Sequence, residues 1–183
     1  MRSRTVKNKK TVRYMTTGAL IAAVYAAVTL LCSLAGLSSG VVQVRLSEAL
    51  CVLVLFTPAA VPGLWIGCVI ANLTTGVIWD VVFGSLATLL GAAGGRLPAL
   101  LSERADRDGK ERRAAVYRCL IPLPTVAANV LIVPFVLKYA YGYGDAVWVM
   151  MATVGLGEIV SAYVCGLLLM WALRRRGGRF LKP

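Results

Sequence analysis

The apolar stretch Tyr14-Met-Thr-Thr-Gly-Ala-Leu-Ile-Ala-Ala-Val-Tyr-Ala-Ala-Val-Thr-Leu-Leu-Cys-Ser-Leu-Ala-Gly-Leu37 decides the class of fold, because it contains no charged residue. As a helix, a stretch of this length extends about 36 Å, more than the ~30 Å thickness of the hydrocarbon core of a bilayer. The basic residues before it also fit a secretory signal, but the apolar run is long for the core of one. We therefore expect a retained membrane-spanning helix.

The composition extends this expectation to the whole chain of 183 residues. Hydrophobic residues make up 58% of it and charged residues 15%, whereas soluble domains carry about 25% charged residues. Apolar runs long enough to cross the bilayer recur along the chain. The sequence therefore predicts an all-α polytopic membrane protein with a single membrane domain.

Proline, glycine and charge clusters divide the chain into six expected membrane-spanning helices, which form one bundle. Basic segments are expected before the first helix (1–13), between the fourth and fifth (102–116) and after the sixth (174–183). The helices are expected at about 14–35, 41–57, 61–78, 80–101, 117–140 and 146–173.

The basic residues predict the orientation. Seventeen of the 20 Lys and Arg residues lie in or beside the three basic segments. Basic clusters flanking apolar spans mark cytoplasmic segments, so we expect both termini and the segment 102–116 on the cytoplasmic side. This distribution also disfavours a nucleic-acid-binding protein, despite the net charge of +12.

The second expected helix is unusual because it begins with Gln43-Val-Arg-Leu-Ser-Glu-Ala-Leu50. Arg45 and Glu48 are three residues apart, the spacing at which side chains meet on one face of a helix. Its uninterrupted apolar part, Ala49 to Phe56, extends only about 12 Å. Such a segment should face the protein interior, where ionisable groups usually mark a functional site. The alternative is a pair that merely anchors the end of the helix.

Further polar residues fall in the outer half of the expected bundle and predict one outward-opening pocket. Glu158, near the middle of the last helix, needs a partner or water. Asp80 could instead be a helix N-cap. Asn72 and Asn129 could instead form hydrogen-bonding links between helices, and Trp79 could instead anchor the protein at the membrane interface. The candidate substrate-binding residues are Arg45, Glu48, Asn72, Trp79, Asp80, Asn129 and Glu158.

Small residues line the first expected helix at spacings of three and four. Such patterns allow close contact between helices, either inside the protein or with another membrane protein, and the sequence leaves both alternatives open. The candidate partner-docking residues are Ala19, Ala22, Ala23, Ala26 and Ala27.

The chain has no phosphate-binding loop, since Gly91-Ala-Ala-Gly-Gly-Arg96 lacks the required lysine. Without histidine it has no Ser–His–Asp triad, and its five cysteines lack the paired spacing of a disulfide framework or a metal site. We therefore expect neither an enzyme nor a bound metal or cofactor.

Residues Gln43 to Gly91 resemble the QueT family of substrate-binding (S) components of energy-coupling factor (ECF) transporters. The similarity is carried by Gln43-Val-Arg-Leu-Ser-Glu-Ala-Leu50, Pro62-Gly-Leu-Trp-Ile-Gly67, Ala71-Asn72 and Trp79-Asp80-Val-Val-Phe-Gly-Ser-Leu-Ala-Thr88. The number of helices and the alanine pattern extend it across nearly the whole chain.

The resemblance implies an importer subunit of the bacterial cytoplasmic membrane. Such a subunit binds its substrate from outside and docks through its first helix onto a transmembrane coupling protein. Two separate ATPases then drive its reorientation. The implied substrates are queuosine precursors, which are 7-deazaguanine bases.

Two other classes of protein remain open at this stage. One is a self-sufficient, ion-coupled secondary transporter in which Glu158 carries a proton. The other is a structural membrane protein without a small ligand.

Overall fold

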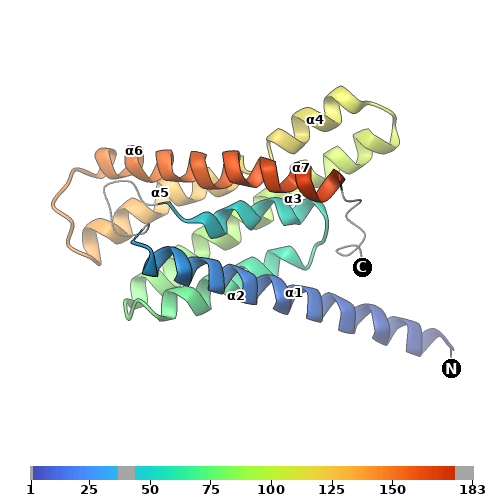
Figure 1. The fold of residues 1–183 in the computed structure, drawn as a ribbon, viewed down its shortest axis with the longest axis horizontal. Helices are drawn as coiled ribbons and strands as arrows, with labels where there is room; N and C mark the ends of the chain where they lie inside the picture. Colours follow the sequence, from blue (N-terminus) through green and yellow to red (C-terminus); the bar gives the residue numbers. More distant parts are fainter. Residues whose placement is uncertain (1, 37–43, 176–183) are drawn as a thin grey trace.

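The computed structural model describes residues 2–36 and 44–175, and within them all regular secondary structure is helical (Figure 1). This confirms the all-α prediction. The elements are α1 (Arg2–Leu34), η1 (Leu46–Leu55), α2 (Ala60–Leu73), η2 (Asp80–Gly84), α3 (Ser85–Arg107), α4 (Glu111–Cys119), α5 (Leu123–Tyr139), α6 (Val147–Glu158), η3 (Ile159–Cys165) and α7 (Gly166–Arg175).

The helices lie roughly along one long axis (Figure 1). The start of α1, the turn between α3 and α4 and the end of α7 lie at one end of the bundle, which we call the basic end. The connections from α2 to η2 and from α5 to α6 lie at the opposite end. This arrangement agrees with the expectation that the start of the first helix, the segment 102–116 and the end of the last helix lie on one side of the bundle. The orientation of that side in a membrane stays a prediction.

In the described part of the chain, four helices are long and apolar enough to cross a membrane. They are Asn8–Leu34, Asp80–Arg107, Glu111–Tyr139 and Val147–Arg175. The second and third of the six expected spans correspond to the shorter apolar helices η1 and α2. These two extend only about 20 Å each.

The second expected helix differs most from its prediction. An α-helix was expected over 41–57, of which 41–43 lie outside the described residues; residues 46–55 instead form a 3₁₀-helix. η1 lies at the centre of the bundle, in contact with α1, α2, α3, η3 and α7. Val52 and Val54 are completely buried. As expected for so short a segment, it faces the protein interior.

The basic segments are more helical than expected. α1 extends back to Arg2, since no proline or glycine interrupts residues 2–17 and Lys and Arg are good helix formers. Most of the expected loop 102–116 is also helical. α3 continues to Arg107, where basic side chains in the last turn favour the helix terminus. Gly109, with φ of 70°, provides the left-handed conformation that ends it.

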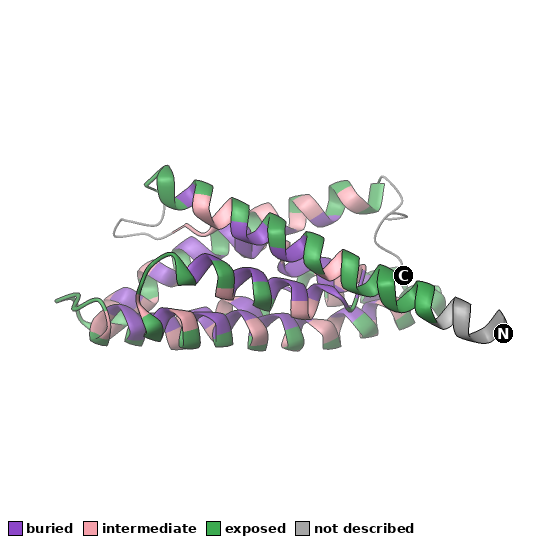
Figure 2. Cartoon of the chain, turned by 90° about the horizontal axis from the view of Figure 1, so that it is seen from below, coloured by how far each residue is buried: buried purple, intermediate pink, exposed green. Residues whose placement is uncertain are grey.

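α1 packs chiefly against α2 through small residues. A Cβ atom added at Gly63 would lie 2.7 Å from the carbonyl oxygen of Gly18, and one added at Gly67 would lie 2.7 Å from that of Ala22. The two backbones therefore approach as closely as glycine allows. Before this contact, α1 projects beyond the packed bundle, and its residues 8–16 are all exposed (Figure 2).

Candidate functional site

Three buried acidic residues lie in or directly beside three irregular helical segments. Glu48 lies within the 3₁₀-helix η1, Asp80 begins the π-helical segment η2, and Glu158 directly precedes the π-helical segment η3. Long 3₁₀ runs and π-helical turns are uncommon and are often found at functional sites. Their coincidence with the acidic residues identifies this region as the candidate site.

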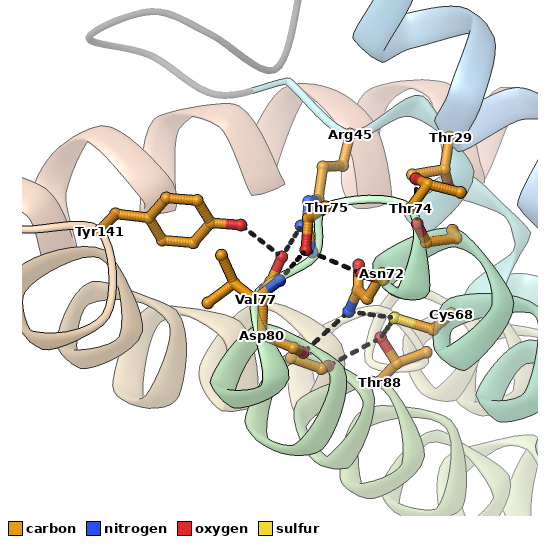
Figure 3. A network of polar contacts seen from close by, with 12 residues as sticks. Thr29, Arg45, Cys68, Asn72, Thr74, Thr75, Val77, Asp80, Thr88 and Tyr141 are labelled. Carbon is orange, nitrogen blue, oxygen red and sulfur yellow. Dashed lines mark hydrogen bonds and ion pairs between the residues drawn. The ribbon is translucent and has the colours of Figure 1, made fainter.

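The outer part of the site is formed around Asp80 (Figure 3). Its Oδ2 atom accepts a hydrogen bond of 3.0 Å from the hydroxyl of Tyr141 and lies 3.8 Å from Nη2 of Arg45. The expectation that Arg45 and Glu48 meet on one face of a helix was therefore wrong. The reason is that Arg45 precedes η1 with φ −102° and ψ 87°, so the two residues do not share a helical face. Burial raises the pKa of Tyr141.

Asn72 connects α2 to η2 (Figure 3). Its Nδ2 atom donates to the carbonyl oxygen of Asp80 at 3.0 Å and to Sγ of Cys68 at 3.4 Å. A Cβ atom at Gly84 would lie 2.8 Å from this nitrogen and 2.9 Å from Oδ1 of Asp80. Asn72 thus links α2 to η2, which is the structural role that the sequence left open beside ligand binding. The absence of a side chain at Gly84 leaves room for the amide of Asn72.

Glu48 lies deeper, with 2% of its surface exposed. Its Oε1 atom accepts hydrogen bonds from the hydroxyl of Tyr25 on α1 and, at 3.4 Å, from Oγ1 of Thr88 on α3. The hydroxyl of Thr88 also lies 3.3 Å from Sγ of Cys68. A carboxylate buried among helices is thus held by hydroxyl donors from two of them, as burial of an acidic group requires.

The innermost part of the site contains polar atoms without partners. Glu158 is 4% exposed and Asn129 1% exposed. Asn129, on α5, lies close enough to interact with the carboxyl groups of both Glu48 and Glu158. Nevertheless Nδ2 of Asn129 and Oε2 of Glu158 have no hydrogen-bond partner in the structure, and neither has the hydroxyl of Ser161 or Thr125. Buried polar atoms without partners are rare in folded proteins, so this group demands an explanation.

The described site presents mainly hydrogen-bond acceptors. Three acidic residues face one arginine, Arg45, which interacts electrostatically with Asp80, Glu48 and Glu158. Carboxylates can accept adjacent N–H groups of a planar ligand in bidentate fashion. No group of three or more metal-binding side chains occurs in the described residues. The arrangement is suited to binding a small polar molecule with several donors.

One predicted site residue lies outside this cluster. Trp79 is 57% exposed and stacks on Phe83, with ring centroids 5.9 Å apart. It lines an apolar groove of about 480 Å³ with residues of α5. The aromatic residues that do join the cluster are Tyr25 and Tyr141. Tyr25 was missed because it lies in an alanine-rich stretch that gives no polar signal.

The predicted docking residues divide into two groups. Ala22 and Ala26 are buried, on the face of α1 that packs inside the protein. Ala19, Ala23 and Ala27 are exposed, so that only these three are open to another protein.

Comparisons with known proteins agree with one another. A model of the QueT transporter family matches residues 15–175. A related protein, the queuosine precursor transporter QueT of Lactococcus lactis subsp. cremoris (strain MG1363), is 29% identical over 181 residues. That alignment covers 93% of this chain and 97% of the relative. No solved structure gives a significant match.

Proposed function

Because this chain belongs to the QueT transporter family, we propose that it is the substrate-binding membrane subunit of an importer for a queuosine precursor of the 7-deazaguanine type. The observation that carries the proposal is the buried group of unpaired polar atoms on Asn129 and Glu158, beside the carboxyl group of Glu48. A ligand bound there would supply the missing partners.

A 7-deazaguanine matches these residues in hydrogen-bonding capacity. Its ring N–H and exocyclic amine are adjacent donors, which one carboxylate accepts together. The carbonyl oxygen of the base accepts a hydrogen bond, for which the unpaired Nδ2 of Asn129 is a buried donor. Glu158 and Asn129 are therefore the residues that we assign to base recognition.

The excess of acidic groups favours a cationic ligand. Glu48, Asp80 and Glu158 outnumber the single Arg45 in the described cluster. We therefore expect the 7-aminomethyl form, which carries an ammonium group, to bind more tightly than the neutral 7-cyano form. Equal affinity of the two forms at neutral pH would contradict this assignment.

Transport in this proposal depends on separate ATP-hydrolysing subunits. The exposed stripe Ala19, Ala23 and Ala27 allows close approach of another helix, and we assign it to an ECF transmembrane coupling protein, which two ATPases would drive. The chain would lie in the bacterial cytoplasmic membrane with both termini cytoplasmic, as the distribution of basic residues favours.

The decisive experiment is equilibrium binding of 7-aminomethyl-7-deazaguanine to the purified chain in detergent, with guanine as competitor. Glu158→Ala should weaken binding about 30-fold or more, since it removes a charged hydrogen-bonding group. Glu111→Ala, which removes an exposed glutamate of α4, is the matched control and should bind as wild type. Absence of binding to a folded preparation would reject the proposed substrate.

The buried carboxyl group of Glu158 also favours a second candidate, a proton-coupled secondary transporter. Reconstitution of the chain alone in proteoliposomes separates the two. Uptake that collapses with the proton gradient would support the second candidate. Uptake that requires the coupling protein and ATP would support the first.

A further inference from the structure

A groove of about 650 Å³ lies at the basic end, between α4 and α7, and shares no lining residue with the candidate site. Three arginines line it, Arg118 from α4 and Arg174 and Arg175 from the end of α7. Its remaining lining includes the apolar side chains of Leu167, Met170 and Trp171, which precede the arginines along α7. The groove is therefore charged toward the end of the bundle and apolar toward its middle.

The arginines of this groove carry more charge than their neighbours neutralise. Asp106 of α3 is shared, because its Oδ1 atom lies 2.5 Å from Nη2 of Arg118 and its Oδ2 atom lies 3.9 Å from Nη1 of Arg174. Arg175 lies over the ring of Trp171, 5.0 Å from its centroid, and has no acidic partner in the described chain. Three guanidinium groups thus face one carboxylate.

Of the other acidic residues on and between α3 and α4, two are paired elsewhere, and Glu111 is exposed at the first turn of α4, seven residues before Arg118. Glu103 is bound to Arg96 at 3.2 Å and Asp108 to Lys110 at 3.1 Å. Arg118 is held in place, since its Nε atom also donates to the hydroxyl of Ser102 at 3.1 Å. An anion entering the groove would therefore meet an excess of positive charge, part of it fixed in position.

An apolar hollow continues the groove along α7. This hollow, of about 580 Å³, is lined by Tyr163, Val164, Leu167, Leu168 and Trp171, and it shares Leu167 and Trp171 with the charged groove. From Trp171 to Val164 it extends about 10 Å away from the arginines. The side chains of Leu168 and Trp171 are largely exposed on this surface.

The charged groups lie at the ends of apolar helices. Arg174 and Arg175 end the candidate membrane span Val147–Arg175, and Asp106 lies at the end of Asp80–Arg107. This is the depth at which lipid headgroups meet the protein, and Trp171, one turn earlier, is a residue typical of that interface.

We propose that the groove between α4 and α7 binds one anionic phospholipid. Its phosphate lies among the guanidinium groups of Arg118, Arg174 and Arg175, and one acyl chain lies in the apolar hollow along α7. Basic pockets between membrane helices suit anionic headgroups. A lipid fits better than a soluble anion, because a soluble anion would leave the adjoining hollow without an occupant of matching chemistry.

The test uses the purified full chain in detergent and phosphatidylglycerol with brominated acyl chains, which quench a tryptophan in contact with them. Phosphatidylglycerol should quench at a lower lipid fraction than brominated phosphatidylcholine, and Trp171→Phe should remove this difference. The double variant Arg174→Gln/Arg175→Gln should weaken the apparent affinity for phosphatidylglycerol about 25-fold.

The matched control is Arg112→Gln/Arg113→Gln, which removes the same charge from exposed positions of α4 outside the groove. It should leave the affinity unchanged, because a specific site depends on position and not on net charge. Equal loss in the two double variants would overturn the proposal, as would equal quenching by the two lipids. Full displacement of the lipid by millimolar inorganic phosphate would also overturn it, in favour of a soluble anion.

Discussion

The contact between α1 and α2 leads to a quantitative prediction for Gly67→Ala. The added Cβ atom would lie 2.7 Å from the carbonyl oxygen of Ala22, 2.8 Å from Cβ of Tyr25 and 3.0 Å from Cα of Ala22. Two of these neighbours are backbone atoms of α1 and the third is a Cβ atom. A change of side-chain rotamer moves none of them, so it cannot relieve the overlap. Ordinary contacts of this kind are about 3.5–4.0 Å, so α1 has to move by roughly 1 Å.

Overpacking of this kind costs about 1–3 kcal/mol, while alanine in place of glycine inside a helix gains about 1 kcal/mol. We therefore expect Gly67→Ala to destabilise the protein by up to about 2 kcal/mol. For a chain of this size each kcal/mol corresponds to about 2–4 °C in Tm, so the melting temperature of the purified protein should fall by up to about 8 °C.

Gly155→Ala, inside α6, is the matched control. Its Cβ atom would meet only Cγ2 of Val130, at 3.4 Å, which is ordinary contact with the end of a side chain. The same chemical change should therefore leave the melting temperature unchanged or raise it by up to about 4 °C. A melting temperature for Gly67→Ala equal to or above that of Gly155→Ala would refute the reasoning about close backbone approach.

Three further variants test the site and the docking face. Glu48→Gln keeps the size of the side chain and should preserve folding while lowering ligand affinity about 10- to 100-fold in equilibrium binding; wild-type affinity would leave Glu48 a structural role only. Ala23→Trp, on the exposed face of α1, should abolish ATP-driven uptake but not ligand binding, whereas Ala152→Trp, on an exposed position of α6, should affect neither; normal uptake by Ala23→Trp would exclude this face from docking. Tyr141→Phe removes the hydrogen bond to Asp80, and because the pKa of Tyr141 is raised by burial, the folded state favours the protonated hydroxyl. The difference in melting temperature between wild type and Tyr141→Phe should therefore stay constant from pH 7 to about 10 and disappear only above that; a decline starting nearer neutral pH would contradict this.

The sequence predicted the features that depend on composition. Apolar runs predicted helices, and the described chain is helical. Ionisable residues are scarce in these apolar runs, so the few that occur indicated where a functional site lies. Of the seven predicted binding residues, six belong to one polar cluster, and five of these are buried: Glu48, Asn72, Asp80, Asn129 and Glu158. Burial of a polar group in so apolar a chain requires polar neighbours, and this requirement brings such residues together.

The features that the sequence did not predict depend on local backbone geometry. The i, i+3 spacing of Arg45 and Glu48 indicates a contact only if both residues are in one α-helix, and Arg45 is not helical. The π-helical segments were not predicted either; one begins at Asp80, the other directly follows Glu158, and such turns are rare within helices. Trp79 was assigned to the site as an aromatic ring on which a flat ligand could stack, yet consecutive helical residues point in different directions, and its ring lies on the outer surface.

α1 connects the exposed alanine face to the acidic cluster. Ala23 and Tyr25 lie two residues apart on opposite sides of this helix, one exposed and the other completely buried and donating to Glu48. Because Gly63 and Gly67 bring the backbone of α2 against α1, α1 cannot slide along α2 without steric overlap at these positions. A helix packed on the alanine face therefore has two ways to act on α1. Either it moves α1 and α2 together, or it separates them and displaces the hydroxyl of Tyr25 from Glu48. The first leaves the acidic cluster intact, while the second exposes a buried carboxyl group and lowers affinity for a ligand bound there.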